Sequence, residues 1–175
     1  MPPSADAEFS AVYTDTYWPV MRYFVRRLAG DAEHARDLTA EVFAVAWRRR
    51  SALPSEPLPW LYEVARRVLS NERRSERRRA RLTEAVRQQH LVQQPDPVHA
   101  PEGTDWVHRA LEHLSESDQE VLRLATWEEL STDQLAVALR CSRSAAAMRL
   151  HRARERFRTV LDREHELQQA RRRSR

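Results

Sequence analysis

The chain of 175 residues contains no lysine, no isoleucine, two glycines (Gly30 and Gly103) and one cysteine (Cys141). Without lysine there is no phosphate-binding Walker lysine, no Schiff-base lysine and no lysine general base. Two isolated glycines cannot form a glycine-rich loop around a phosphate group. A single cysteine excludes an intramolecular disulfide and a multi-cysteine zinc site, and it is typical of a reducing compartment. These absences exclude several large classes of enzyme and metalloprotein.

Long apolar segments are also missing. The longest wholly apolar run extends from Val42 to Trp47, far short of the roughly 20 residues of a membrane helix. The first residues lack the charged and apolar regions of a secretory signal. None of the seven histidines forms a metalloprotease-type pair with a neighbouring glutamate. We therefore expect a soluble, cytoplasmic protein without membrane insertion, without a metal or other cofactor, and without enzymatic activity.

The composition that remains favours helices. Alanine, leucine, arginine and glutamate are abundant, and no segment shows sustained alternation of apolar and polar residues, so the sequence predicts an all-α fold. Residues 92–104 contain three prolines and one glycine, which is typical of a flexible linker. This segment separates a predicted N-terminal domain, residues 1–91, from a predicted C-terminal domain, residues 105–165. The basic tail, residues 166–175, is expected to be disordered.

The N-terminal domain is predicted to contain three long helices. The first covers about residues 6–29, with a kink at Pro19. The second follows Asp31, a favourable N-cap, and extends to about residue 50. The third begins near Trp60, and its apolar stripe ends at Leu69. Arginine accumulates after that point.

The C-terminal domain is predicted to contain four shorter helices. Their approximate ranges are 104–114, 116–126, 132–139 and 143–165. Ser115 is a favourable N-cap, and Ser131 with Gln134 matches the capping-box pattern. The last two helices are separated only by residues 140–142, which is the arrangement of a helix-turn-helix.

Charge is distributed unevenly, although the net formal charge is only +4. Residues 66–81 and residues 140–158 each carry a charge of +6, whereas residues 102–133 carry −7. All 30 basic residues are arginines. Two basic blocks, one in each predicted domain, fit a partner with an extended negative surface, and nucleic acid is the natural candidate. The alternative is that both blocks are ordinary solvated helix faces.

An acidic ridge lies on the second predicted helix. Glu33, Asp37 and Glu41 follow one another at four-residue spacing, so their carboxylates share one face and repel by a few tenths of a kcal/mol per pair, roughly. The ridge is either an ordinary solvated face, which is the simpler interpretation from the residues alone, or a docking surface for a basic partner.

The last predicted helix has the pattern of a recognition helix. Its inward face is formed by Ala146, Leu150, Ala153, Phe157 and Leu161. Its outward face and flanks carry the candidate DNA-binding residues Arg143, Ser144, Met148, Arg149, Arg152 and Arg156. Such a helix inserts its first turns into the major groove while flanking arginines bind phosphates. The alternative is an amphipathic helix of a bundle with its arginines in water.

Several motifs, in their order along the chain, resemble those of bacterial sigma factors of the extracytoplasmic-function group. Residues 37–47, Asp-Leu-Thr-Ala-Glu-Val-Phe-Ala-Val-Ala-Trp, resemble the helix that binds core RNA polymerase, and residues 60–66 resemble the helix that follows it. Residues 110–114, 135–136 and 149–154 resemble the promoter-binding domain. The resemblance covers about residues 8–80 and 106–162. Arg140 stands where these proteins typically have glycine.

This resemblance implies a transcription initiation factor with two helical domains. The first would bind the β′ clamp helices of core RNA polymerase, through Asp37 and Glu41, and would open the minus-ten element of promoter DNA. The second would read the minus-thirty-five element next to the β flap. Residues placed near the minus-ten strand are Trp60, Arg66, Arg67, Asn71, Arg73 and Arg74. Arginine suits phosphate and Trp60 suits base stacking, although a core position is the alternative for Trp60. An anti-sigma factor is a possible further partner.

A rival interpretation is a helix-turn-helix regulator that acts without binding core polymerase as a sigma subunit. It shares the second domain with the first interpretation, but it leaves the acidic ridge of Glu33, Asp37 and Glu41 unexplained.

Overall fold

Every regular element that the computed structural model describes is a helix, in agreement with the predicted all-α fold. The structure describes residues 5–86 and 105–173, so the whole of the predicted linker, residues 92–104, lies outside the described residues. The chain divides into two units, Met1–Val98 and His99–Arg175. None of the described helices has a stretch long and apolar enough to cross a bilayer.

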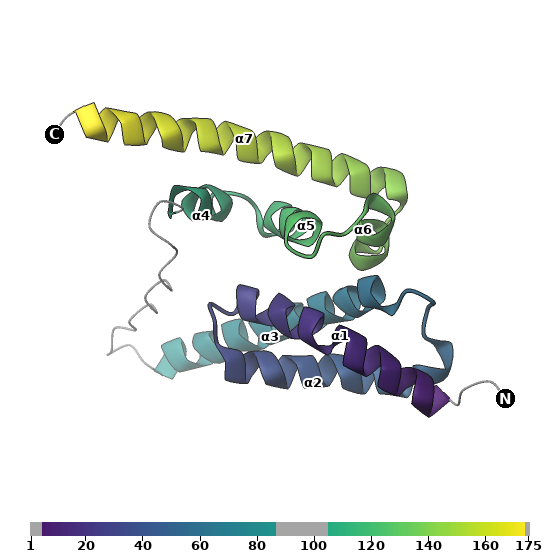
Figure 1. The fold of residues 1–175 in the computed structure, drawn as a ribbon. Coiled ribbons are helices and arrows are strands. Elements are labelled where there is room, and N and C mark those ends of the chain that lie inside the picture. The colour runs from purple at the N-terminus through teal and green to yellow at the C-terminus, as the bar shows by residue number, and fades with distance from the viewer. Residues whose placement is uncertain (1–4, 87–104, 174–175) are drawn as a thin grey trace. The chain divides into compact units, whose positions relative to one another are not determined.

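Residues 5–86 of the first unit form three long helices and one short 3₁₀ turn (Figure 1). They are α1 (Ala5–Arg27), α2 (Ala32–Arg48), η1 (Arg50–Ala52) and α3 (Pro57–Val86). The predicted N-cap is confirmed, because the carboxylate of Asp31 accepts a hydrogen bond from the backbone N–H of His34 at 3.0 Å. Helix α3 begins at Pro57, three residues before the predicted start, since proline suits the first turn of a helix.

The core of the first unit is formed where α1, α2 and α3 pack against one another. Its largest fully buried side chains are Val20, Tyr23, Phe24, Val42, Leu61 and Tyr62. Burial of each large apolar side chain contributes about 1.5–3 kcal/mol. Thr39 is also fully buried, and its hydroxyl donates to the backbone carbonyl of Ala35 at 2.7 Å. The polar group inside the core is therefore satisfied.

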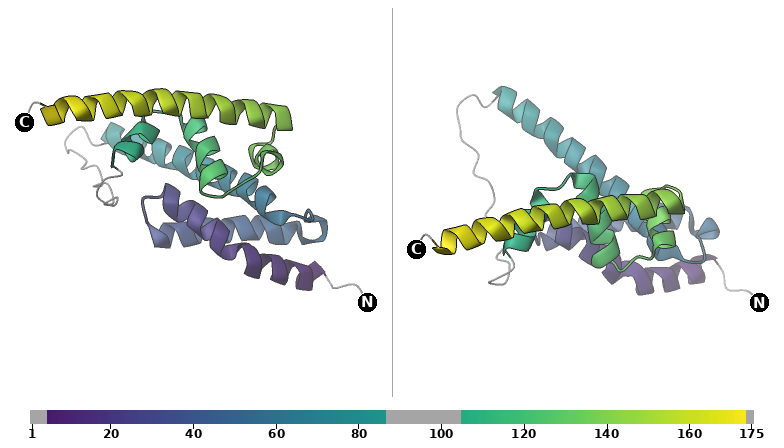
Figure 2. Two further views of the ribbon diagram at one scale, coloured as in Figure 1. Left: turned by 45° about the horizontal axis from the view of Figure 1, so that its top comes forward. Right: turned by 90° about the horizontal axis from the view of Figure 1, so that it is seen from above.

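Helix α3 contributes to this core with only part of its length. The predicted apolar stripe is confirmed, with Leu61, Ala65 and Leu69 buried. None of residues 70–81 is buried, and this half of the helix projects past α1 and α2 (Figure 2). The arginines of residues 66–81 are thus carried on a helix that is anchored in the core at one end and largely exposed towards the other.

The described residues of the second unit form four helices, and two of them have the predicted bounds. They are α4 (Asp105–Glu112), α5 (Glu116–Thr126), α6 (Thr132–Leu139) and α7 (Arg143–Arg173). The predicted capping box is confirmed. The hydroxyl of Ser131 accepts from the N–H of Gln134 at 3.3 Å, and the side-chain oxygen of Gln134 accepts from the N–H of Ser131 at 2.9 Å. These bonds fix where α6 begins.

Helix α7 lies along one side of α4, α5 and α6 (Figures 1 and 2). Ala146, Leu150 and Ala153 are buried on its inward face, and Phe157 and Leu161 are half-buried. The helix was expected to end at residue 165 and to be followed by a disordered tail, but it continues to Arg173. The added residues are mainly glutamate, glutamine, leucine, alanine and arginine, which are strong helix formers, and no glycine or proline interrupts them.

The turn between α6 and α7 depends on one residue with a left-handed backbone. Arg140 has φ 51° and ψ 52°. Its N–H donates to the carbonyl of Val137 at 3.1 Å, and the N–H of Cys141 donates to Ala136 at 3.0 Å. This conformation costs a residue with a Cβ roughly 1–2 kcal/mol, and glycine avoids the cost. Arg140 stands where the proteins that the sequence resembles typically have glycine, so it introduces a local strain that the packing of α7 offsets.

A pair of substitutions on α6 tests this packing. Leu135 is fully buried, whereas Val137, two residues later, is 46 % exposed. Leu135→Ala should lower the free energy of unfolding by about 2–5 kcal/mol, because it removes core contacts and leaves a cavity. Val137→Ala should change it by less than about 0.5 kcal/mol. Urea denaturation of the full chain measures both, and equal losses would contradict the assigned orientation of α6.

Candidate nucleic-acid interface

The acidic ridge is exposed along α2. Glu33, Asp37 and Glu41 all face solvent, and the helix buries the opposite face, which includes Leu38 and Val42, in the core. Within residues 5–86, neither Asp37 nor Glu41 is ion-paired with a described residue. The repulsion within the ridge is therefore not compensated inside this unit, and the carboxylates are accessible to a basic partner.

The residues expected near the minus-ten strand lie on two neighbouring strips of α3. Trp60, Arg67, Asn71 and Arg74 follow one another at spacings of seven, four and three residues, which places them on one face. Trp60 is half-buried, and the other three are exposed. Trp60 thus packs partly against its own unit, as a core position requires, and keeps part of its ring exposed, as base stacking requires.

Arg66 and Arg73 form the second strip of α3. They are seven residues apart and half-buried, beside the first strip. On the first strip, the guanidinium of Arg67 pairs with the carboxylate of Glu63 one turn earlier, at 2.6 Å. This ion pair orients Arg67 along the helix, while half of its side chain stays exposed. The structure therefore brings all six predicted residues onto one side of α3, as an arginine-rich surface with one aromatic ring at its start.

A further ionic cluster joins α2 to α3, and sequence spacing does not indicate it. Nε2 of His34 lies 3.6 Å from Oε1 of Glu72, and Nη1 of Arg79 lies 3.9 Å from the same oxygen. The ligand atoms of His34, Glu72 and Glu76 lie within 4.8 Å of one another. Because an arginine already lies at the shared carboxylate, we interpret the group as a polar contact between the helices and not as a metal site. Only the tertiary contact of α2 with α3 brings these residues together.

The predicted recognition surface is exposed on α7. Ser144, Met148 and Arg152 succeed one another at four-residue spacing on the outward face, and the side chain of Met148 is 51 % exposed. Arg149 is exposed on the adjacent strip. No described acidic residue is ion-paired with Arg149 or Arg152. Both cations are thus accessible to a polyanion.

Arg143 lies at the start of α7 and joins the two helices of the helix-turn-helix. Its Nε lies 3.1 Å from a carboxylate oxygen of Asp133, at the start of α6. Both side chains are largely exposed, so this ion pair contributes less than about 1 kcal/mol. It orients the guanidinium without burying it, and Arg143 stays accessible at the turn.

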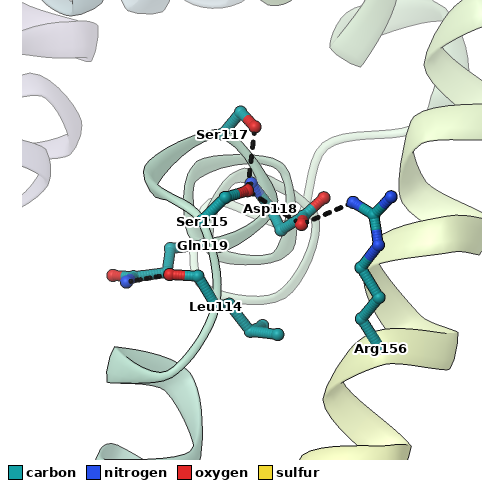
Figure 3. Close-up of polar contacts among 6 residues, drawn as sticks. All are labelled: Leu114, Ser115, Ser117, Asp118, Gln119 and Arg156. Carbon is teal, nitrogen blue, oxygen red and sulfur yellow. Dashed lines mark hydrogen bonds and ion pairs between the residues drawn. The ribbon is translucent and has the colours of Figure 1, made fainter.

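Arg156 differs from the other predicted DNA-binding residues, because it points to α5 (Figure 3). Its Nη1 lies 2.7 Å from Oδ2 of Asp118, a residue that is only 8 % exposed. The hydroxyl of Ser115 donates to the same oxygen at 2.8 Å. Asp118 was not among the predicted site residues, because the two partners lie far apart in the sequence and no local spacing relates them.

Comparison with known protein families matches both units. Residues 14–79 match sigma-70 region 2, and residues 104–157 match sigma-70 region 4. The first match spans most of α1, α2 and α3, and the second spans α4 to the middle of α7. Together they cover the acidic ridge, both strips of α3 and the exposed face of α7.

Individual relatives agree with these matches. The chain is 30 % identical over 151 residues to the RNA polymerase sigma-E factor of Streptomyces coelicolor, and the match covers 85 % of this chain and 84 % of that protein. It is 29 % identical over 163 residues to the ECF RNA polymerase sigma factor SigL of Mycobacterium tuberculosis, covering 90 % and 92 %. Among solved structures, the sigma factor RpoE of Bartonella quintana, in complex with the anti-sigma factor NepR, has the same fold. Its TM-score is 0.63 at 21 % identity, covering 88 % of this chain and 96 % of that one.

Proposed function

The chain belongs to the extracytoplasmic-function group of sigma factors, and we propose that its two helical units divide promoter recognition between them. It is an alternative sigma factor that binds core RNA polymerase and directs transcription initiation at particular promoters. The observation that carries this conclusion is the presence, in one chain and in the expected order, of sigma-70 regions 2 and 4. A helix-turn-helix regulator that does not bind polymerase has no need of region 2.

For the first unit, we propose that α2 docks on the polymerase. Asp37 and Glu41 are exposed and are not ion-paired with any described residue of their unit, so a basic partner removes their mutual repulsion and supplies the missing counter-charge. The resemblance assigns this partner to the β′ clamp helices. In this proposal the acidic ridge is a docking surface and not an ordinary solvated face.

The arginine-rich surface of α3 is proposed to hold the minus-ten strand. Arg66, Arg67, Arg73 and Arg74 supply phosphate-binding cations on one side of a projecting helix, and Asn71 lies among them with an amide for base edges. Part of Trp60 stays accessible at the start of the same strip, where an extruded base can stack. An open single strand suits such a surface because its bases are unpaired.

The exposed face of α7 is proposed to read the minus-thirty-five element. Ser144, Met148 and Arg152 would enter the major groove, and Arg143 and Arg149 would bind phosphates at its rim. With alanines at residues 145–147, few side chains of the first turns reach base edges. Arg152 is therefore the main candidate for base recognition, since arginine pairs with guanine through two hydrogen bonds.

Sigma factors are transcription factors without enzymatic activity of their own, and we propose the same for this chain, with the cytoplasm as its place of action. The Bartonella quintana protein of the same fold is in complex with the anti-sigma factor NepR. We include an anti-sigma protein among the candidate partners of this chain.

Reversing the charge of the ridge tests the docking of α2. The double variant Asp37→Arg, Glu41→Arg should bind core polymerase at least about tenfold more weakly in a pull-down or anisotropy titration, since about 1.4 kcal/mol of lost attraction suffices. The matched control is Glu8→Arg with Asp15→Arg, which makes the same change of charge at exposed positions of α1. Binding of the ridge variant at wild-type strength would refute the docking proposal.

Strand opening tests the surface of α3. Arg74→Ala should lower the fraction of opened promoter by about tenfold, because it removes one charged hydrogen bond to the strand. Arg79→Ala is the control. Arg79 lies on the same side of α3 as Glu72, to which it is paired, and outside the two strips. Permanganate reactivity of the minus-ten thymines measures opening. If both variants behave alike, the two strips of α3 are not the binding surface.

Two arginines of α7 should have different effects on promoter binding by holoenzyme. Arg152→Ala should lose about 1–3 kcal/mol of discrimination against changed base pairs in the upstream element. Arg158 is exposed on the other flank of α7, where it pairs with the exposed Glu155, and we expect it to bind phosphate. Arg158→Ala should therefore weaken binding uniformly across sequences and reduce the salt slope by about one. Binding isotherms on a mapped promoter and its mutated versions measure both. Equal effects of the two substitutions on every sequence would contradict this division of roles.

A further inference from the structure

The contact between Asp118 and Arg156 joins α7 to the beginning of α5 (Figure 3). Asp118 lies in the first turn of α5, where its backbone N–H donates to the hydroxyl of Ser115 at 3.2 Å. The Ser115 hydroxyl in turn donates to Oδ2 of Asp118, and Arg156 donates to the same oxygen. One carboxylate oxygen thus accepts from the N-cap of its own helix and from a cation of another helix.

The burial of Asp118 makes Arg156 necessary to the unit. A buried carboxylate is tolerated when it is hydrogen-bonded and paired with a charge. The N-terminus of α5 contributes a partial positive charge, and Arg156 is the ion-pair partner found for Asp118 among the described residues. If Arg156 moved away to bind a DNA phosphate, the buried carboxylate of Asp118 would keep only the Ser115 hydroxyl and the N-terminus of α5 as partners. The other exposed arginines of α7 carry no such penalty.

The position of Arg156 on α7 gives this contact a geometric consequence. Arg156 lies seven residues after Arg149, on the same strip, and three residues after the buried Ala153. The apolar contacts of Ala146, Leu150 and Ala153 hold α7 against the other helices and determine which face it buries, but apolar contacts are not directional and leave small rotations of the helix open. A short ion pair to a capped helix end is directional. It fixes how far α7 is rotated about its own axis over α5.

We propose that Arg156 is a positioning residue for minus-thirty-five recognition and not a phosphate contact. Asp118 holds the Arg156 guanidinium at the start of α5, and the resulting orientation of α7 presents Ser144, Met148 and Arg152 to the major groove. The inference rests on the proposed function, in which α7 reads this element. It reassigns one of the arginines that the sequence pattern places at the DNA.

The test compares Arg156→Ala with Arg149→Ala in holoenzyme, on a duplex with a mapped upstream element and on one with that element scrambled. Arg149 is the matched control, because it occupies the same strip of α7 without an ion-pair partner among the described residues. Binding is measured over a range of salt concentrations. Loss of a phosphate contact reduces the salt slope by about 0.9, whereas loss of a positioning contact leaves the slope unchanged.

We expect Arg149→Ala to reduce the salt slope and to weaken binding to both duplexes alike. Arg156→Ala should leave the slope unchanged and should reduce the preference for the mapped element by about tenfold, the cost of one misplaced base contact. Arg156→Lys, which keeps a cation within reach of Asp118, should restore most of the preference. A slope reduced as in Arg149→Ala, or an unchanged preference, would overturn the proposal.

Asp118→Asn provides a second variant in case Arg156→Ala does not fold. It keeps the volume and a hydrogen-bond acceptor but removes the charge that holds Arg156. The preference for the mapped element should again fall. The salt slope should equal that of wild type or be steeper, because Arg156 is then free to bind a phosphate. Unchanged preference in Asp118→Asn overturns the proposal. If the wild-type holoenzyme itself binds both duplexes equally, the proposed reading of the upstream element fails instead.

Discussion

The two basic helices, α3 and α7, each bury an apolar stripe in the core of their unit, and this stripe occupies only part of the helix. The rest of the structure depends on this constraint. Leu61, Ala65 and Leu69 fix the first half of α3 in the core of its unit, and Ala146, Leu150 and Ala153 fix the first half of α7. The stripe determines which way the other face points. The arginines of these helices therefore lie on defined sides of their units, and in the proposed function they bind promoter phosphates there.

The acidic residues fall into two kinds, according to whether they are buried and paired within their unit or exposed on its surface. Asp118 is buried and paired with Arg156, so it acts inside its unit. Asp37 and Glu41 lie opposite the buried face of α2, and no described residue of the unit pairs with them. A carboxylate that has its counter-charge within the unit stabilises the fold, whereas one without it is available to a partner. This difference separates the proposed polymerase surface from the positioning contact in the second unit.

The sequence predicted correctly those helix ends that are set by capping residues next to them in the chain. The caps at Asp31, Ser115 and Ser131 satisfy backbone groups of their own helices, so α2 and α5 begin where the sequence indicates and α6 has its predicted bounds. The far end of α7 was predicted too early, because no breaker stands in residues 166–173 and helix propensity continues. The link of His34 with Glu72 and that of Asp118 with Arg156 required the tertiary contacts between helices. The sequence pattern places Arg156 among the DNA contacts, and the proposed positioning role depends on its contact with Asp118.

Start-site mapping is the most direct test of the central claim that this chain is a promoter-specificity subunit with two DNA-reading helices. Transcription of genomic DNA from the source organism is compared between purified core RNA polymerase alone and core polymerase with the full chain. The account predicts discrete new start sites only when the chain is added, each preceded by a shared pair of sequence elements near minus ten and minus thirty-five. No new start sites, or new sites without a shared pair of upstream elements, would contradict it.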